Sequence, residues 1–179
     1  QRFISPGIVL PSGQLPLTLQ FWHKRDIEAQ SSGTACYDGA ILEASSDAGT
    51  TWTQVGSAAL LTDPYTGLVS SSFSNPLANL QAWCGVKGWT NSIVDIGTYA
   101  GQTVQFRYRA GSNNSASHDG WYIDDVKVQS CVAGATYTVG GNVGGLTGSG
   151  LVLSLNSGAQ TLAVPTSGPF TFPTGLANG

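Results

Sequence analysis

The chain has 179 residues, of which 41% are hydrophobic and only 9% are charged, and its formal net charge is −3. This hydrophobic fraction excludes a disordered chain, and the length fits one domain or one domain with a fragment of another. A negative charge without a basic stripe argues against nucleic acid as a partner, and no apolar run approaches the ~20 residues that cross a bilayer.

Cysteine usage and the first residue both favour a secreted protein. Gln1 follows neither an initiator Met nor a signal peptide, so we expect a mature or excised fragment. The three cysteines, Cys36, Cys84 and Cys131, have neither a CxxC nor a zinc-ligand spacing. An odd count in a secreted chain indicates one disulfide and one leftover cysteine; the alternative is three buried free thiols.

Short alternating segments, separated by turn residues, predict strands along the first 130 residues. The clearest is residues 15–27, and one face of it carries Leu17, Leu19, Phe21, His23 and Arg25. Further strands are expected at residues 40–44, 51–55, 92–96, 103–110 and 121–128, with a turn-rich stretch at 60–80. Without an amphipathic helix longer than two turns, this pattern predicts an all-β fold, an antiparallel jelly-roll β-sandwich.

The composition changes near residues 131–135, which predicts a domain boundary. Residues 136–179 hold no charged side chain, and glycine pairs such as Gly140-Gly141 punctuate their short apolar runs. We therefore expect a β-sandwich at residues 1–132 and an incomplete Ig-like β domain at 133–179. The alternative for the second segment is a tail that packs on the first domain.

The segment from Ser45 to Trp52 fits the Asp-box pattern Ser-x-Asp-x-Gly-x-Thr-Trp. Asp47 can accept hydrogen bonds from the backbone of its own turn, Gly49 can take a positive φ, and Trp52 can bury its ring over the hairpin. The pattern therefore predicts a structural hairpin and not sialidase or glycosidase activity.

Acidic residues from separate segments suggest a metal site. Asp124 and Asp125 lie in an apolar run, and because neighbouring strand residues point to opposite faces, one of them should point inward. A buried carboxylate needs a cation or several donors, and hard oxygen ligands suit Ca²⁺. We expect calcium to be bound by Asp38 and one of Asp124 or Asp125, with Glu28 assisting. The alternatives are a loop-capping aspartate or an ion pair with Lys24, Arg107 or Arg109.

No motif indicates a catalytic centre. His23 and His118 are the only histidines, and neither His-Glu-x-x-His nor Gly-x-Ser-x-Gly occurs. Nothing in the sequence orders a serine and a histidine into a triad, and His23 is interpreted as a half-buried strand residue. The five tryptophans could form a platform for sugars, although core positions are the favoured interpretation.

Several short motifs follow one another in a specific order along the first 130 residues: Phe21-Trp22-His23, Cys36-Tyr37-Asp38-Gly39, Ser46-Asp47-Ala48-Gly49, Trp83-Cys84-Gly85, Tyr99-Ala100-Gly101-Gln102 and Gly120-Trp121-Tyr122-Ile123-Asp124-Asp125. By this order, residues 1–130 resemble the MAM-like jelly-roll modules of bacterial secreted peptidases, immune-inhibitor-A-like proteins and surface proteins.

The resemblance implies a two-sheet jelly roll with a structural metal, often calcium, and no catalytic centre. It matches Cys36 and Cys84 to positions that pair. It also makes residues 136–179 the start of an Ig-like repeat that stops early, so that Cys131 has lost its partner. The predicted function is a non-catalytic, calcium-stabilised accessory or adhesion module of a secreted bacterial protein, with an extracellular protease as the leading parent. Other domains of that parent are the expected partners, together with an extracellular protein or a glycan. A carbohydrate-binding module that uses exposed tryptophans is the alternative, and a small hydrolase is the third hypothesis.

Overall fold

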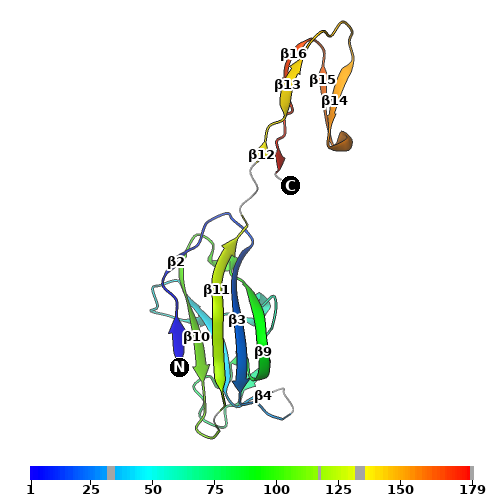
Figure 1. Ribbon diagram of the computed structural model, residues 1–179. Helices are drawn as coiled ribbons and strands as arrows, with labels where there is room; N and C mark the ends of the chain where they lie inside the picture. Colours follow the sequence, from blue (N-terminus) through cyan, green and yellow to red (C-terminus); the bar gives the residue numbers. More distant parts are fainter. Residues whose placement is uncertain (32–34, 117, 132–135, 178–179) are drawn as a thin grey trace. The chain divides into compact units, whose positions relative to one another are not determined.

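The computed structural model describes residues 1–31, 35–116, 118–131 and 136–177. The chain divides into two compact units, Gln1–Val132 and Ala133–Gly179. The division falls where charged residues cease in the sequence. Each unit is described separately below (Figure 1).

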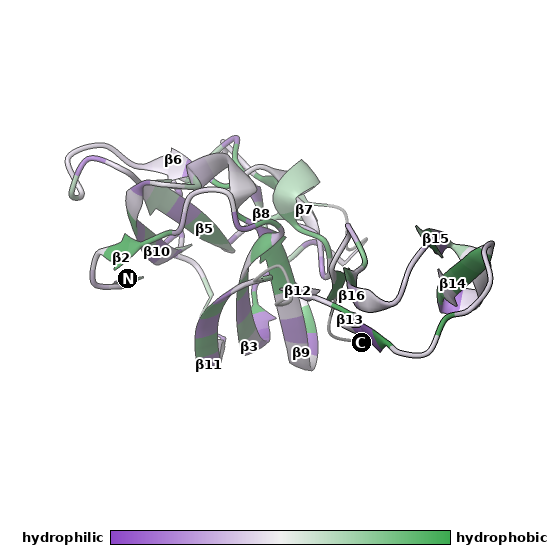
Figure 2. Ribbon diagram, turned by 90° about the horizontal axis from the view of Figure 1, so that it is seen from above, coloured by the Kyte–Doolittle hydropathy of each residue, from purple (hydrophilic) through white to green (hydrophobic). Residues whose placement is uncertain are grey.

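The first unit is built from two antiparallel sheets that form separate layers (Figure 2). One sheet has the order β1 (Arg2–Ile4), β10 (Thr103–Gly111), β5 (Gly39–Ser45) and β6 (Thr53–Gln54), and β2 (Ile8–Val9) also pairs with β10. The other has the order β11 (Gly120–Ser130), β3 (Leu17–Ile27) and β9 (Gly85–Asp95). A small third sheet has the order β4 (Ala35–Cys36), β7 (Gly67–Val69) and β8 (Gln81–Ala82). The predicted all-β sandwich is confirmed.

Strand β3 forms because its side chains alternate between the core and the outside. The face that carries Leu17 and Arg25 is buried at every position between them, and Trp22 on the other face is the one exposed residue of the strand. The favoured core position is therefore wrong for Trp22. Strand β5 is different, since all seven of its residues are buried. Figure 2 shows the alternation as green and purple bands along β11, β3 and β9.

Aromatic rings fill the space between the two layers. The Phe21 ring meets Tyr108 edge-on, with 5.0 Å between centroids, and meets Trp83 in the same way at 5.9 Å. All three side chains are buried. Edge-to-face rings pack densely, so this cluster holds the two sheets together.

Cys36 and Cys84 form the expected disulfide, which joins positions 48 residues apart. Cys131 is free and exposed. The alternative of three buried free thiols is therefore wrong.

The second unit consists of three nested strand pairs. These are β12 (Thr136–Tyr137) with β17 (Leu176–Ala177), β13 (Gly140–Val143) with β16 (Gly168–Thr171), and β14 (Leu151–Leu155) with β15 (Gln160–Val164). Of its described residues, only Val164 and Phe172 are buried hydrophobics. The incomplete Ig-like domain and the packed tail both stay predictions for this segment.

Helical structure in the described residues is limited to three short 3-10 turns: Ser57–Ala59, Gly97–Tyr99 and Asn156–Gly158. None is long and apolar enough to span a membrane.

Candidate functional sites

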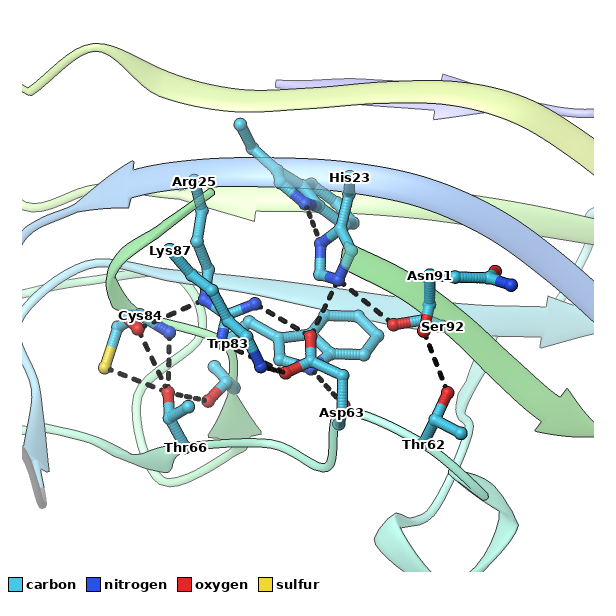
Figure 3. Close-up of polar contacts among 12 residues, drawn as sticks. His23, Arg25, Thr62, Asp63, Thr66, Trp83, Cys84, Lys87, Asn91 and Ser92 are labelled. Atoms are coloured by element: carbon cyan, nitrogen blue, oxygen red, sulfur yellow. Dashed lines mark hydrogen bonds and ion pairs between the residues drawn. The ribbon is translucent and has the colours of Figure 1, made fainter. Parts of the chain in front are cut away.

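A buried cluster contains a serine, a histidine and an aspartate. His23 points inward from β3, and its Nε2 atom lies 3.0 Å from the Ser92 hydroxyl of β9 and 2.8 Å from a carboxylate oxygen of Asp63 (Figure 3). These three residue types are those of a hydrolase triad. The cluster therefore has to be tested as a candidate active site.

The geometry of this cluster does not allow triad chemistry. In a working triad, the serine and the aspartate use different nitrogens of the histidine. Here both contact Nε2, while Nδ1 accepts a hydrogen bond of 2.8 Å from the indole N–H of Trp121. The neutral His23 ring must then carry its proton on Nε2, so that atom cannot accept the Ser92 proton. His23 and Ser92 are also 0% exposed, which puts them out of reach of a substrate.

Asp63 is the buried centre of a network of charged side chains. It accepts a 2.8 Å hydrogen bond from Arg25, whose side chain is only 2% exposed, and it also pairs with Lys87. Its backbone carbonyl accepts a 2.8 Å bond from the Trp83 indole. Burial by itself would raise the pKa of Asp63, but the bonds from His23, Arg25 and Lys87 outweigh it and hold the pKa well below its ordinary value.

The same environment keeps His23 neutral. Burial lowers its pKa from the ordinary value, and this effect is larger than the opposing effect of the Asp63 carboxylate. The cluster therefore consists of a neutral histidine and a charged Arg25–Asp63–Lys87 group. Its chemistry is that of a structural ion-pair network.

The structure brings together two of the four predicted metal ligands. Asp38 accepts a 2.7 Å bond from the backbone N–H of Asn113, and Glu28 accepts a 3.3 Å bond from the side-chain amide of the same residue. Burial raises the pKa of Asp38, and the nearby negative charge of Glu28 also raises it. The hydrogen bond from Asn113 acts in the opposite direction but is outweighed. Asn113 thus bonds to both carboxylates near the end of β3.

A cleft of about 490 Å³ lies beside Asp38, lined by residues of β1, β10 and β11. At this cleft His118 bonds to Asp26 at 2.7 Å. The hydroxyl of Tyr108, which also lines the cleft, has no hydrogen-bond partner among the described residues. The described part of the chain places no group of three histidine, cysteine, aspartate or glutamate side chains where they could hold a metal together.

Asp124 and Asp125 lie elsewhere, and the expectation that one of them points inward is wrong. Both are exposed. The pairing of β11 with β3 shifts between Asp124 and Lys127, and Asp125 has a φ of 50° in this bulge. An extra residue in a bulge breaks the alternation of faces, so both carboxylates are left outside the core. Asp124 is four residues, or about 13 Å of strand, from Gly120, which pairs with Asp26 at the end of β3 nearest Glu28.

The alternative ion pairs for Asp124 and Asp125 do not form either. Arg107 and Arg109 pair with Glu43. Lys24 lies over the Tyr122 ring, 4.5 Å from its centroid. Asp124 instead accepts a 2.8 Å bond from the backbone N–H of Asp125.

The Asp-box residues make local contacts within one hairpin. Asp47 accepts bonds of 2.9 and 3.0 Å from the backbone N–H of Thr51 and a 2.7 Å bond from Ser45. Gly49 has a φ of 84°, and its carbonyl accepts a 3.0 Å bond from the Trp52 indole. The Trp52 ring lies against Arg107, at 4.3 Å. The hydrogen bonds of Asp47 and of the Trp52 indole thus stabilise the turn, and the Trp52 ring also contacts β10.

Sequence reasoning did not identify Asp63, and for His23 it predicted the strand but not the degree of burial. The prediction of a half-buried His23 is wrong, since the ring is fully buried. Asp63 lies in the stretch at residues 60–80 that the sequence predicts to be rich in turns. The contacts of Asp63 with His23 and Arg25 join residues that are 40 and 38 positions apart in the sequence. A local sequence pattern cannot predict a contact over such a separation.

Comparison with known proteins shows that part of this chain is similar in sequence to a peptidase. A segment of 48 residues, 27% of this chain, is 40% identical to Bacillopeptidase F of Bacillus subtilis (strain 168). The chain spans only a small part of that protein, because the match covers 3% of its length. No family model matches the chain.

Proposed function

We propose that this chain is a non-catalytic accessory or adhesion module of a secreted bacterial protein, with an extracellular protease as the parent. The observation that carries the proposal is the buried cluster, where the residues with catalytic chemistry are committed to the core. His23 Nε2 bonds to Asp63 at 2.8 Å and its Nδ1 bonds to Trp121 at 2.8 Å, so neither nitrogen is available as a general base.

Three further observations support the secreted, protease-associated setting. Part of the chain is similar to Bacillopeptidase F. The Cys36–Cys84 disulfide is typical of proteins that fold in an oxidising compartment. The motifs of residues 1–130 resemble the modules of bacterial secreted peptidases. Other domains of the parent protein are the partners that this function requires.

We also propose that calcium stabilises the module at Glu28 and Asp38. These carboxylates fit the hard oxygen ligands of Ca²⁺, and both approach Asn113, at 3.3 and 2.7 Å respectively. The remaining ligands would be backbone carbonyls and water, since no third carboxylate or histidine joins them in the described residues. Asp124 and Asp125 are not part of this proposed site, because both are exposed at the bulge of β11.

The test of the accessory role is an activity assay of the purified 179-residue chain on casein, gelatin and a panel of glycosides. We expect no turnover. Turnover that is lost in a Ser92→Ala variant with an unchanged melting temperature would contradict the proposal, because it would make the buried cluster catalytic. Turnover that survives in Ser92→Ala but is lost on substitution of Asp26 or His118 at the cleft would contradict it as well.

A further inference from the structure

Three exposed aromatic side chains lie on the outer face of the sheet β11–β3–β9, one on each strand. They are Trp22 on β3, Trp89 on β9 and Tyr122 on β11, and they are 41%, 50% and 45% exposed. We call this set the aromatic face. Trp83 of the same unit is fully buried, so the unit uses its tryptophans in two different ways.

The strand register places the aromatic face in two adjacent rows. In the first row, Trp22 lies opposite Asp124 on one side and Asn91 on the other. In the second row, Lys24 lies opposite Tyr122. On the other side of β3, strand β9 has one extra residue between the pairs His23–Thr90 and Arg25–Lys87. Gly88 and Trp89 therefore both lie opposite Lys24.

This arrangement spaces the rings across the sheet. With strands about 4.8 Å apart and a rise of about 3.3 Å per residue, Tyr122 and Trp89 are about 10 Å apart at the backbone, and Trp22 is about 8 Å from each. The aromatic pairs of the core, such as Phe21 with Tyr108, have centroids 5.0 Å apart. The rings of the aromatic face are thus spread out across the three strands.

Polar groups alternate with the rings. Asp124 and Asn91 flank Trp22, and Lys24 stands between Tyr122 and Trp89. The two rows carry one positive and one negative side chain, so they have no net charge. Lys24 lies 4.5 Å from the Tyr122 centroid, a cation–π contact that holds this ring in place.

We propose that the aromatic face binds a neutral polysaccharide chain that lies extended across the three strands. Pyranose rings have an apolar C–H face that can stack on Trp and Tyr and a hydroxyl edge that can bond to Asp124 and Lys24. Isolated rings with polar groups between them suit such a ligand, whereas the centre of a protein interface is a continuous apolar patch. Zero net charge favours a neutral glycan over an acidic one. This deepens the proposed function, because it names the ligand class of the accessory module.

The test is retention of the 179-residue chain on microcrystalline cellulose and on chitin particles, followed by tryptophan fluorescence titration with the corresponding soluble oligosaccharides. We expect retention on at least one of the two and a fluorescence change on titration. Trp22→Ala and Trp89→Ala should each weaken binding about tenfold, because each removes one stacking ring. Trp22→Tyr should retain most of the binding, which separates stacking from a general structural effect.

Phe73→Ala is the matched control, since Phe73 is 47% exposed and lies on a loop outside the aromatic face. It should bind as the unchanged chain does, and all variants should keep the same circular dichroism spectrum. Equal binding by Trp22→Ala, Trp89→Ala and the unchanged chain would overturn the proposal. Retention on immobilised collagen with none on either polysaccharide would also overturn it, in favour of a protein ligand. Neither result would affect the activity assay above, so failure of the glycan proposal is distinct from failure of the accessory role.

Discussion

The indole N–H of Trp121 donates a hydrogen bond of 2.8 Å to Nδ1 of His23. It connects the inner faces of β11 and β3, and it determines which nitrogen of His23 carries a proton. If His23 became protonated, its Nδ1–H would face the indole N–H, and a hydrogen bond would become a contact between two donors. The folded protein therefore favours the neutral ring for a geometric reason as well as through burial.

The stability of the first unit should fall as the pH falls below about 6.5. His23 has a folded-state pKa below the ordinary value of 6.5, so in this range the unfolded chain binds the proton more readily than the folded one. Stability then decreases as the pH falls from about 6.5 to the folded-state pKa. Urea denaturation at several pH values between about 7 and about 5 measures this slope.

The histidine responsible can be identified by substitution. His23→Gln should flatten the slope, because the group that titrates is removed, although the variant will be less stable at neutral pH. His118→Gln removes the other, exposed histidine and should retain the slope. An unchanged slope in His23→Gln would show that the pH dependence has another origin.

Asp63→Ala should destabilise the protein by about 3–5 kcal/mol, because it leaves the Arg25 guanidinium buried without its counter-charge. The Arg25 side chain is only 2% exposed, so water cannot replace the lost carboxylate. Asp63→Asn keeps the shape and one acceptor and should lose less. Asp124→Ala, an exposed aspartate, should change stability by no more than about 0.5 kcal/mol. Thermal or chemical denaturation compares the three, and similar losses for Asp63→Ala and Asp124→Ala would contradict a central role for Asp63.

Removal of the disulfide should lower the free energy of unfolding by about 4 kcal/mol, on the chain-entropy estimate for a loop of this size. The bridge joins positions 48 residues apart and anchors the small sheet to the start of β9. The double variant Cys36→Ala with Cys84→Ala measures the effect by denaturation. Cys131→Ser should leave stability unchanged, since that cysteine is free and exposed. A stable double variant would mean that the core alone holds the fold.

The sequence was sufficient where local periodicity decided the structure. The alternation along residues 15–27 placed Leu17, Phe21 and His23 on one face of a strand, and the structure buries that face. The sandwich class followed from the number of such segments and the turns between them. These features depend on neighbours in the chain, so they can be deduced from the chain.

The sequence failed where a local rule was broken or where a contact was distant. The two-residue period of a strand predicted that one of Asp124 and Asp125 points into the core. The bulge at Asp125 adds a residue to the strand, and both side chains therefore lie outside the core. Asp63 lies in a turn-rich stretch, and its partners come from β3 and β9. A bulge and a loop-to-strand ion pair both depend on the packing of the whole sandwich.

The position of the calcium site can be settled by comparing two aspartates. If calcium binds at Glu28 and Asp38, binding to the folded state alone stabilises the protein by about 2.7 kcal/mol at a concentration 100 times the dissociation constant. The melting temperature of the unchanged chain should then fall with excess chelator and recover with added Ca²⁺. Asp38→Asn should lose this response, because its carboxylate is a ligand. Asp125→Asn should keep it, because Asp125 is exposed in the bulge of β11.

Each outcome of this comparison has a distinct meaning. Loss of the response in Asp125→Asn alone would restore the set of ligands that the sequence suggested and move the site to β11. Absence of any chelator effect, together with no metal by elemental analysis, would contradict calcium altogether. Asp38 and Glu28 would then be held by Asn113, which donates to them at 2.7 and 3.3 Å, and Glu28 also by the Ser115 hydroxyl at 3.5 Å. In that case Asn113→Ala should destabilise the protein, because it removes the amide that bonds Glu28. With calcium bound, the cation would offset that loss, so the same substitution should cost less in added Ca²⁺ than in chelator.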